Sequence, residues 1–242
     1  MEEKLQTLQR WLEESKRVVF FGGAGVSTES SIPDFRSQDG LYNQKYDHPP
    51  EVILSHSFFV SHTEEFYRFY RDKMIYPHAK PNAAHLALAR MEQTGKLTAV
   101  VTQNIDGLHQ AAGSRNVLEL HGSVLRNRCM ACGRFFGGTD CITQSDGVPR
   151  CPCGGIIKPE VTLYEEMLPD SVMEKAIEHI AQADMMIVGG TSLGVYPAAG
   201  LVNYYHGNKL VLINRSPTPY DSKADLLIGG SIGQVLGGLK IL

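Results

Sequence analysis

The 242-residue sequence predicts an α/β protein in which a doubly wound parallel sheet is interrupted by a helical insertion and a small metal-binding module. Three observations predict this class. Short apolar segments alternate with helix-like segments, as expected when helices cover both faces of a parallel sheet. Glycine-rich turns follow two of the apolar segments directly. Four of the five cysteines lie in two close pairs.

The elements are predicted in chain order from apolar periodicity and from Pro or Gly at their ends. Leu5, Leu8, Trp11 and Leu12 recur at helical spacing, and the apolar run 18–21 that follows predicts a buried strand. The later elements are a helix at 81–92, strands at 97–102 and 117–120, a helix from 169 to 180, strands at 185–188 and 209–213, and a helix at 232–239.

Residues 42–80 and 125–163 break this alternation. In the first segment, Phe59, Phe66 and Phe69 are placed on one helical face. The second segment holds all the cysteines. We therefore assign 1–41, 81–124 and 164–242 to the sheet domain, 42–80 to a helical insertion and 125–163 to a zinc-binding module, the last two forming a small domain.

Charge and hydropathy exclude several classes of protein. With 23 basic and 26 acidic side chains the net charge is −3, which argues against nucleic-acid or membrane binding through bulk charge. The longest apolar runs, such as 18–21, hold about four residues, far fewer than a bilayer-spanning helix needs. The first residues lack a signal-peptide pattern, so a cytoplasmic location is expected.

The cysteine spacing predicts a structural zinc site. Cys129 and Cys132 are followed by Cys151 and Cys153, with 18 residues between Cys132 and Cys151. Two pairs at this separation can close a tetrahedron of thiolates, although the second pair is one residue shorter than C-x-x-C. Four free or buried cysteines are the alternative. A site filled by four thiolates leaves no place for a catalytic water, and Cys141 is a spare thiol.

Two glycine-rich turns predict a site for phosphates at the carboxyl ends of strands. The run 22–28 (GGAGVST) follows the first strand, and 189–194 (GGTSLG) follows the strand at 185–188. The first lacks the third glycine of G-x-G-x-x-G, and a tight turn without a ligand is its alternative. The second matches G-x-S-x-G of serine hydrolases, but no acidic residue lies between Ser192 and His206, so that triad cannot form in its usual order.

The remaining polar clusters are 32–37 (IPDFRS), 102–106 (TQNID) and 121–122 (HG). The last two follow predicted strands, so their side chains are expected to face the same crevice. Amide and carboxylate side chains suit ribose hydroxyls and amides, and His121 can take a proton at neutral pH. A surface ion pair of Asp34 with Arg36 and an ordinary histidine at 121 are the alternatives when each cluster is taken alone.

Together these motifs and the cysteine pairs resemble the sirtuins over nearly the whole chain, in the same order. The resemblance implies a Rossmann-like doubly wound parallel sheet with a small zinc-ribbon domain and a helical insertion, with NAD between the domains. It also implies an NAD-dependent protein lysine deacetylase that transfers the acyl group of acyl-lysine to ADP-ribose and releases nicotinamide and O-acetyl-ADP-ribose. The partners implied are acetylated-lysine proteins or peptides.

The resemblance also implies roles for individual residues. His121 would be the general base, and Asn104 and Gln103 would orient the ribose and its water. The expected cofactor contacts are Ala24, Thr28, Phe35, Arg36, Gln103, Asn104, Ile105, Asp106, His121, Thr191, Ser192, Asn214 and Ile232. The expected substrate contacts are Thr162, Leu163, Tyr164 and Glu165, where a peptide would add as a β-strand. Cys129, Cys132, Cys151 and Cys153 would hold one structural zinc ion.

Three departures from the family pattern bear on specificity. Ser31 and Glu165 stand where the family has glycine, and the second places a carboxylate beside the peptide groove, which predicts a preference for basic flanking residues. The Tyr-x-x-Arg pair of desuccinylating members is matched here by Tyr67 and Tyr70, with Arg71 one step out of register. We therefore expect acetyl or other neutral acyl groups as substrates.

Two rival functions remain open on the sequence alone. The same NAD site could support mono-ADP-ribosyl transfer to proteins. The zinc module, with Arg126, Arg128, Arg134 and Arg150, could instead belong to a non-catalytic reader of NAD or nucleic acid, although the presence of both His121 and Asn104 argues against this.

Overall fold

A six-stranded parallel sheet forms the centre of the computed structural model, which describes residues 1–35, 40–41 and 47–241. The strands lie in the order β3-β2-β1-β7-β8-β9. In that order their bounds are Val117–Glu119, Leu97–Thr102, Val18–Gly22, Met185–Gly189, Leu210–Asn214 and Leu226–Gly229. The chain leaves β1 toward β3 and then crosses back to β7, which is the doubly wound order with its switch point between β1 and β7. The predicted fold class is confirmed.

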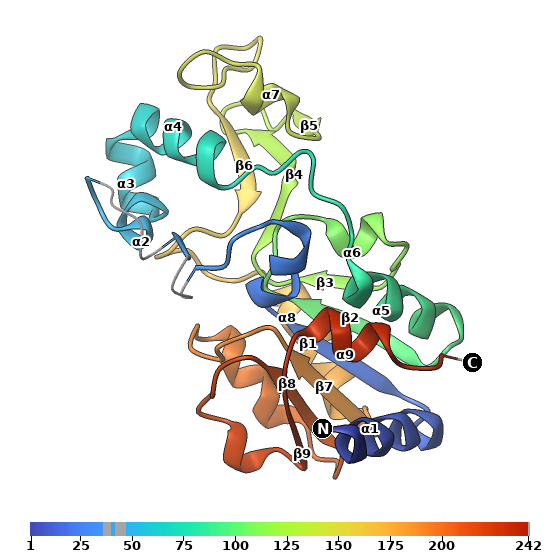
Figure 1. Ribbon diagram of the computed structural model, residues 1–242. Coiled ribbons are helices and arrows are strands. Elements are labelled where there is room, and N and C mark those ends of the chain that lie inside the picture. Colours follow the sequence, from blue (N-terminus) through green and yellow to red (C-terminus); the bar gives the residue numbers. More distant parts are fainter. Residues whose placement is uncertain (36–39, 42–46, 242) are drawn as a thin grey trace.

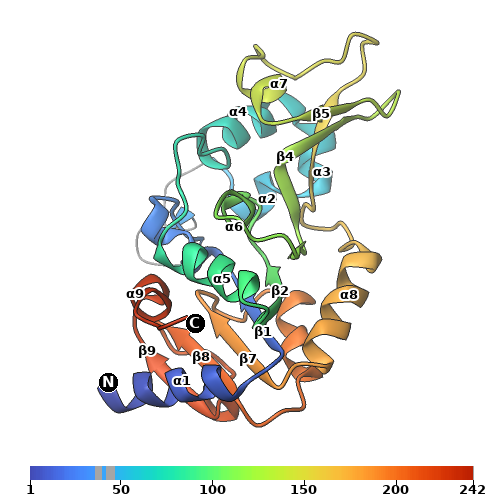
Figure 2. The same ribbon diagram turned by 90° about the vertical axis from the view of Figure 1, so that its right-hand side faces the viewer.

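Helices cover both faces of this sheet (Figure 2). One face carries α1 (Glu2–Glu14), α5 (Ala83–Gln93) and α9 (Ile232–Gly237), and the other carries α8 (Asp170–Ala181) and the 3₁₀ segment Ala198–Tyr204. Alternate residues of β1 point to opposite faces, so Val18 and Phe20 pack with the first group and Val19 and Phe21 with the second. All five residues of β1 are buried, as expected for a central parallel strand.

A second, smaller sheet lies beyond one end of the first (Figure 1). Its antiparallel strands follow the order β5-β4-β6, with bounds Phe135–Gly137, Gly122–Cys129 and Ile157–Val161, and α7 (Asp140–Thr143) lies between β5 and β6 in the chain. It packs against α2 (Pro50–Ile53), α3 (His56–Ser61) and α4 (Thr63–Lys73) in one apolar cluster. The short α6 (Leu108–Ala111) follows β2.

Two details differ from the sequence-based expectation. Phe59, Phe66 and Phe69 do not share one helix, because the chain breaks at His62 (φ −132°, ψ 46°) between α3 and α4. All three rings are nevertheless buried in the same cluster. The edge strand β9 was not predicted. Among the described residues, no helix has both the length and the apolar character needed to cross a membrane.

Candidate active site and metal centre

A cleft of about 960 Å³ opens where the carboxyl ends of β1, β2, β7 and β8 face the helical insertion and the segment after β6. The predicted cofactor residues that line it are Ala24, Thr28, Phe35, Gln103, Asn104, Ile105, Asp106, His121, Thr191, Ser192, Asn214 and Ile232. The predicted substrate residues Thr162, Leu163, Tyr164 and Glu165 line it as well. Arg36 lies outside the described residues.

The two glycine-rich turns pack against each other at the switch point of the sheet. Gly25 N–H donates to the Gly190 carbonyl at 2.8 Å. A Cβ on Gly25 would lie 2.8 Å from Gly190 Cα, and one on Gly190 (φ +60°) would lie 2.4 Å from Val26 N. These glycines are therefore required by loop-to-loop packing. Within the described residues the N–H groups of Ala24 and Thr28 have no acceptor, so they remain available to a ligand in the cleft.

A chain of three polar side chains connects the first turn to the end of β2. Asn104 Nδ2 donates to Ser27 Oγ at 3.0 Å, and Ser27 Oγ donates to Asp106 Oδ2 at 2.6 Å. The Leu108 N–H donates to Asp106 Oδ1 at 2.9 Å. Because Ser27 and Asn104 are buried, these bonds fix the Asn104 amide in one position.

His121 lies between β3 and β4 with its ring at the cleft. Its Nδ1 is 2.9 Å from the Gln103 carbonyl oxygen. A carbonyl can only accept, so Nδ1 carries the hydrogen and Nε2 keeps its lone pair. Burial lowers the pKa of His121, which keeps the imidazole neutral at neutral pH. A neutral imidazole with a lone pair on Nε2 can accept a proton from a group in the cleft.

Thr191 is held from two sides. Its N–H donates to Asn214 Oδ1 at 3.1 Å, and Asn214 Nδ2 donates back to the Thr191 carbonyl at 2.6 Å. Gln103 Nε2 donates to Thr191 Oγ1 at 3.0 Å. The amide of Asn214 is thus engaged by the protein backbone, and it shapes the cleft through Thr191.

Two residues outside the predicted set hold the first glycine turn in place. Asn82, the N-cap of α5, donates from Nδ2 to the Val26 carbonyl at 2.8 Å and to Ser30 Oγ at 3.0 Å. The Glu29 carboxylate accepts from the N-cap hydroxyl of α9, Ser231 Oγ, and from the Gly233 N–H at 3.1 Å. The position of Asn82 directly after Pro81 is a helix-start signal, whereas nothing in the sequence marks Glu29.

The predicted substrate segment is attached to the helical insertion. The Tyr164 N–H donates to the Leu54 carbonyl, and the His56 N–H donates to the Tyr164 carbonyl, both at 3.0 Å. Glu166 Oε2 accepts from the Leu163 N–H at 2.9 Å, and Glu166 Oε1 lies 2.9 Å from His56 Nδ1. The predicted substrate segment is therefore fixed on the side that faces the helical insertion.

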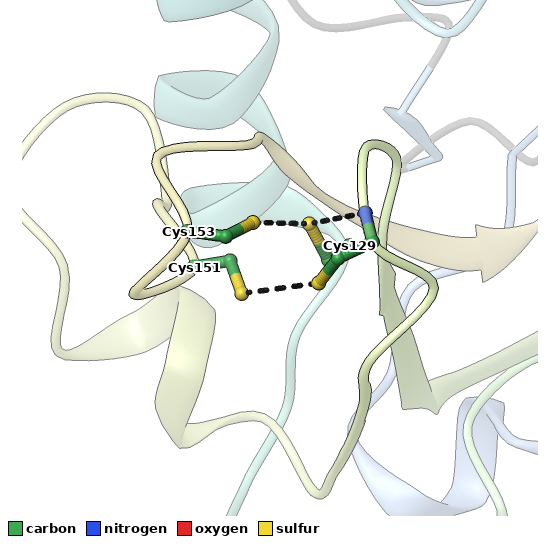
Figure 3. A group of neighbouring side chains, drawn as sticks. Cys129, Cys151 and Cys153 are labelled. Carbon is green, nitrogen blue, oxygen red and sulfur yellow. Dashed lines mark hydrogen bonds between the residues drawn. The ribbon is translucent and has the colours of Figure 1, made fainter.

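The four predicted metal ligands come together at the end of the small sheet (Figure 3). Cys129 Sγ lies 3.5 Å from Cys153 Sγ, Cys132 Sγ lies 3.7 Å from Cys151 Sγ, and the four sulfurs are all within 4.8 Å of one another. Zn–S bonds of about 2.3 Å require tetrahedron edges of about 3.8 Å. These separations fit one metal ion and are too long for disulfides.

Each cysteine pair is followed by a glycine that closes a turn. The Gly133 N–H (φ +73°) donates to the Cys129 carbonyl and the Gly154 N–H (φ +88°) to the Cys151 carbonyl. Hydrogen bonds to Cys129 Sγ, the largest contribution coming from the Cys132 N–H at 3.5 Å, lower the pKa of that thiol to about 6 and favour the thiolate that a metal needs. Cys141 lies outside this group of four.

The strand order and the two glycine turns at its switch point define a dinucleotide-binding α/β protein, here combined with a four-cysteine module. Residues 23–197 match the model of the Sir2 family. A protein of Clostridium acetobutylicum named NAD-dependent protein deacetylase is 60% identical over 97% of each chain. One of Cutibacterium acnes with the same name is 54% identical over 97% of each chain. The chain belongs to the Sir2 family.

Solved structures agree with this assignment. A Sir2 enzyme superposes with a TM-score of 0.89 at 41% identity, covering 98% of this chain and 96% of the other. A Sir2 complex with a p53 peptide and NAD⁺ gives a TM-score of 0.85 at 40% identity, covering 96% of this chain and 95% of the other. The resemblance to sirtuins is confirmed.

Proposed function

We propose that this chain is an NAD-dependent protein lysine deacetylase that transfers the acyl group of acyl-lysine to ADP-ribose, with release of nicotinamide and O-acetyl-ADP-ribose. The single observation that carries the proposal is His121, a neutral histidine whose Nδ1 is bound to the Gln103 carbonyl and whose Nε2 is free to take a proton. The names of the relatives over nearly their full length support the same activity.

The cleft fits NAD on three grounds. Its volume of about 960 Å³ is at the upper end of the range for small-molecule sites. It has unengaged N–H groups at Ala24 and Thr28 for phosphate oxygens, and its lining includes the apolar Ile232, which suits an adenine ring. NAD supplies an ADP-ribosyl group, which serves as the acyl acceptor.

The chain's own residues divide the remaining tasks. His121 Nε2 takes the proton of a ribose hydroxyl, which makes that oxygen a nucleophile toward the acyl carbon. Asn104, fixed by Ser27, orients the ribose and its water together with Gln103. Ile105 and Asp106 contact the nicotinamide amide. Phe35 covers that end of the pocket and excludes water, and Arg36 supplies a charge for the pyrophosphate.

The remaining cofactor contacts belong to the second glycine turn and the strand beside it. Ser192 presents its hydroxyl and N–H, and Thr191 presents its hydroxyl, as donors to phosphate or ribose, while Asn214 keeps Thr191 in place through the Thr191 N–H and carbonyl. We assign one structural zinc ion to Cys129, Cys132, Cys151 and Cys153 on the basis of their spacing and thiolate chemistry. The ion orders the small sheet and takes no part in the reaction.

The peptide substrate adds as a strand to the segment Thr162–Glu165. The backbone groups of Tyr164 are already paired with Leu54 and His56. Within the described residues the N–H and C=O of Glu165 have no partner, so they are the groups that a strand can pair with. The partners are therefore acetylated proteins or peptides in extended form, and neither membrane nor nucleic acid is part of the proposal. We place the enzyme in the cytoplasm.

We also propose that the acyl group is neutral. Tyr67 and Tyr70 are fully buried, and Tyr67 Oη donates to the Ile157 carbonyl at 2.6 Å. The Arg71 guanidinium is engaged by the carbonyls of Ile142 and Gly147 and by Ser145 Oγ. Arg71 therefore holds the loop after α7 and is not available to an acyl carboxylate. A clear preference for succinyl-lysine over acetyl-lysine would contradict this.

The decisive experiment uses an acetyl-lysine peptide with and without NAD, followed by mass spectrometry. We expect loss of the acetyl group, equimolar nicotinamide and O-acetyl-ADP-ribose, all dependent on NAD. His121→Ala should lower turnover by 10²-fold or more, the order expected for removal of a general base, while ADP-ribose still binds. Transfer of ADP-ribose to protein without deacetylation would instead support mono-ADP-ribosyl transfer, which the names of the relatives do not favour.

A further inference from the structure

Glu165 adopts a conformation that its side chain does not favour. Its φ is +75°, in the left-handed region where glycine is normal and other residues are strained. The family pattern has glycine at this position. A glutamate here must therefore be offset by contacts that a glycine cannot make.

The Glu165 carboxylate makes two such contacts, both to Ser57. The Ser57 N–H donates to Oε2 and Ser57 Oγ donates to Oε1, each at 2.9 Å. Ser57 lies in the first turn of α3, where backbone N–H groups have no partner within the helix. We call this pair of bonds the Glu165–Ser57 clasp.

The clasp joins the predicted substrate segment to α3 of the helical insertion. The Tyr164 backbone forms the next connection, to Leu54 and His56. Glu166 forms a third through His56 and Lys158, whose Nζ is 3.3 Å from Oε1. The clasp is the only one of the three that depends on a side chain replacing the family's glycine.

The same residue offers the unpaired backbone groups to which a peptide strand can bind. Within the described chain, neither the N–H nor the C=O of Glu165 has a partner. The Glu166 N–H donates to the Leu163 carbonyl at 3.0 Å and closes a turn with Glu165 as its third residue. A glycine at this position would keep the turn but leave it with more conformational freedom, because glycine has no Cβ and could not bond to Ser57. The clasp fixes the Glu165 backbone beforehand, which lowers the entropic cost of strand pairing.

We propose that Glu165 is a positioning residue for the acyl-peptide, acting through Ser57 and not through the charge of the peptide. This rests on the proposed function, in that the segment Thr162–Glu165 receives the peptide. Both carboxylate oxygens are engaged by Ser57, so discrimination between basic and acidic flanking residues is weak, contrary to the expectation from the sequence.

The test is steady-state kinetics on Glu165→Gly, Glu165→Ala and Ser57→Ala with an acetyl-lysine peptide and NAD. Removing the exposed clasp should raise the KM for peptide about fivefold in both Glu165 variants, with kcat and the KM for NAD within about twofold. Ser57→Ala removes one of the two bonds and should raise the KM for peptide about twofold. The double variant Ser57→Ala with Glu165→Ala should be no worse than Glu165→Ala alone, because both changes remove the same interaction.

Glu165→Gly separates positioning from stability. It relieves the positive φ, so its melting temperature should equal or exceed that of Glu165→Ala while its KM for peptide stays raised. Glu174→Ala, at an exposed acidic residue of α8 away from the cleft, is the matched control and should leave KM unchanged. An unchanged KM in both Glu165 variants would overturn the proposal.

Peptides with arginine or glutamate beside the acetyl-lysine test whether the Glu165 carboxylate recognises the charge of the peptide or only positions the backbone. If Glu165 acts by position, Glu165→Gly weakens both peptides equally. A selective loss for the arginine peptide would show that the carboxylate reads charge and would refute the proposal. Absence of NAD-dependent deacetylation in the unmodified enzyme would instead count against the proposed function, so the two failures are distinguishable.

Discussion

Two buried histidines predict that the protein loses stability in mild acid. His85 on α5 and His109 on α6 are 0% and 1% exposed, and their ring centroids are 4.7 Å apart. His85 Nδ1 accepts from the Asn82 N–H at 3.2 Å. Within the described residues, His85 Nε2 and both ring nitrogens of His109 have no hydrogen-bond partner. Charging the His109 ring would place a cation without a hydrogen-bond acceptor in the core, and at His85 the carboxylates of Asp106 and Glu29 offset only part of the cost of burial.

Burial lowers both pKa values: that of His85 to about 4 and that of His109 to about 3, where the second ring adds to the effect. The unfolded chain takes up these protons below pH 6.5 and the folded chain does not. Unfolding therefore becomes easier as the pH falls from 6.5 toward the folded values, and stability is fully present above 6.5.

The size of the effect follows from the same linkage. Both pKa values in the folded protein lie below 5. The decrease in the free energy of unfolding between pH 7 and pH 5 therefore depends mainly on the histidine pKa of 6.5 in the unfolded chain. It amounts to about 2 kcal/mol for each histidine and about 4 kcal/mol for the pair. This is a large part of a typical domain stability of about 5–15 kcal/mol.

Urea unfolding at pH 7, 6 and 5 measures the effect, with His109→Leu as the test variant. Leucine removes a titrating group and two unpaired nitrogens. Between pH 7 and pH 5 the free energy of unfolding of the variant should therefore fall by about 2 kcal/mol less than that of the parent. Equal slopes for the parent and His109→Leu would refute the reasoning.

Two further predictions concern backbone strain and the metal. Ser31 has φ +63° and is exposed, so Ser31→Gly should stabilise the protein by about 0.5–1 kcal/mol in urea unfolding, whereas Ser171→Gly in α8 should destabilise it by a similar amount. The opposite order would contradict the strain argument. The purified protein should contain one zinc per chain; Cys151→Ser or chelation should lower the melting temperature and abolish deacetylation, whereas Cys141→Ser should not. A metal-free protein with full activity would exclude a structural zinc site.

The sequence predicted the fold where periodicity and burial act together. The strand at 97–102 has the bounds Leu97–Thr102 in the structure, because every position except Thr98 is buried and the turns on both sides are polar. The edge strand Leu226–Gly229 was missed since only alternate residues are buried in four residues, too short a pattern to recognise. The break at His62 was missed because one apolar stripe continues across two helices that pack into the same cluster.

The candidate site was predictable only in part, because its motifs are local and its support is not. The glycine turns and the cysteine pairs carry their chemistry in adjacent residues. The contacts of Glu29 with Ser231, and of Asn82 with the Val26 carbonyl, join residues far apart in the chain. No local pattern encodes them. The contact of Glu165 with Ser57 is of the same kind, since the two residues are 108 positions apart in the chain.

These long-range contacts explain how the cleft can be formed before its ligands arrive. The first glycine turn is held by Asn82 on one side and bonded to Gly190 on the other, and its Glu29 carboxylate fixes the start of α9. Each of these contacts supplies a hydrogen-bond partner to a backbone group that would otherwise have none. None of them uses the Ala24 N–H, which stays available to a ligand. Because loops that are already ordered lose little conformational entropy on binding, the cleft has what a dinucleotide site at a switch point requires.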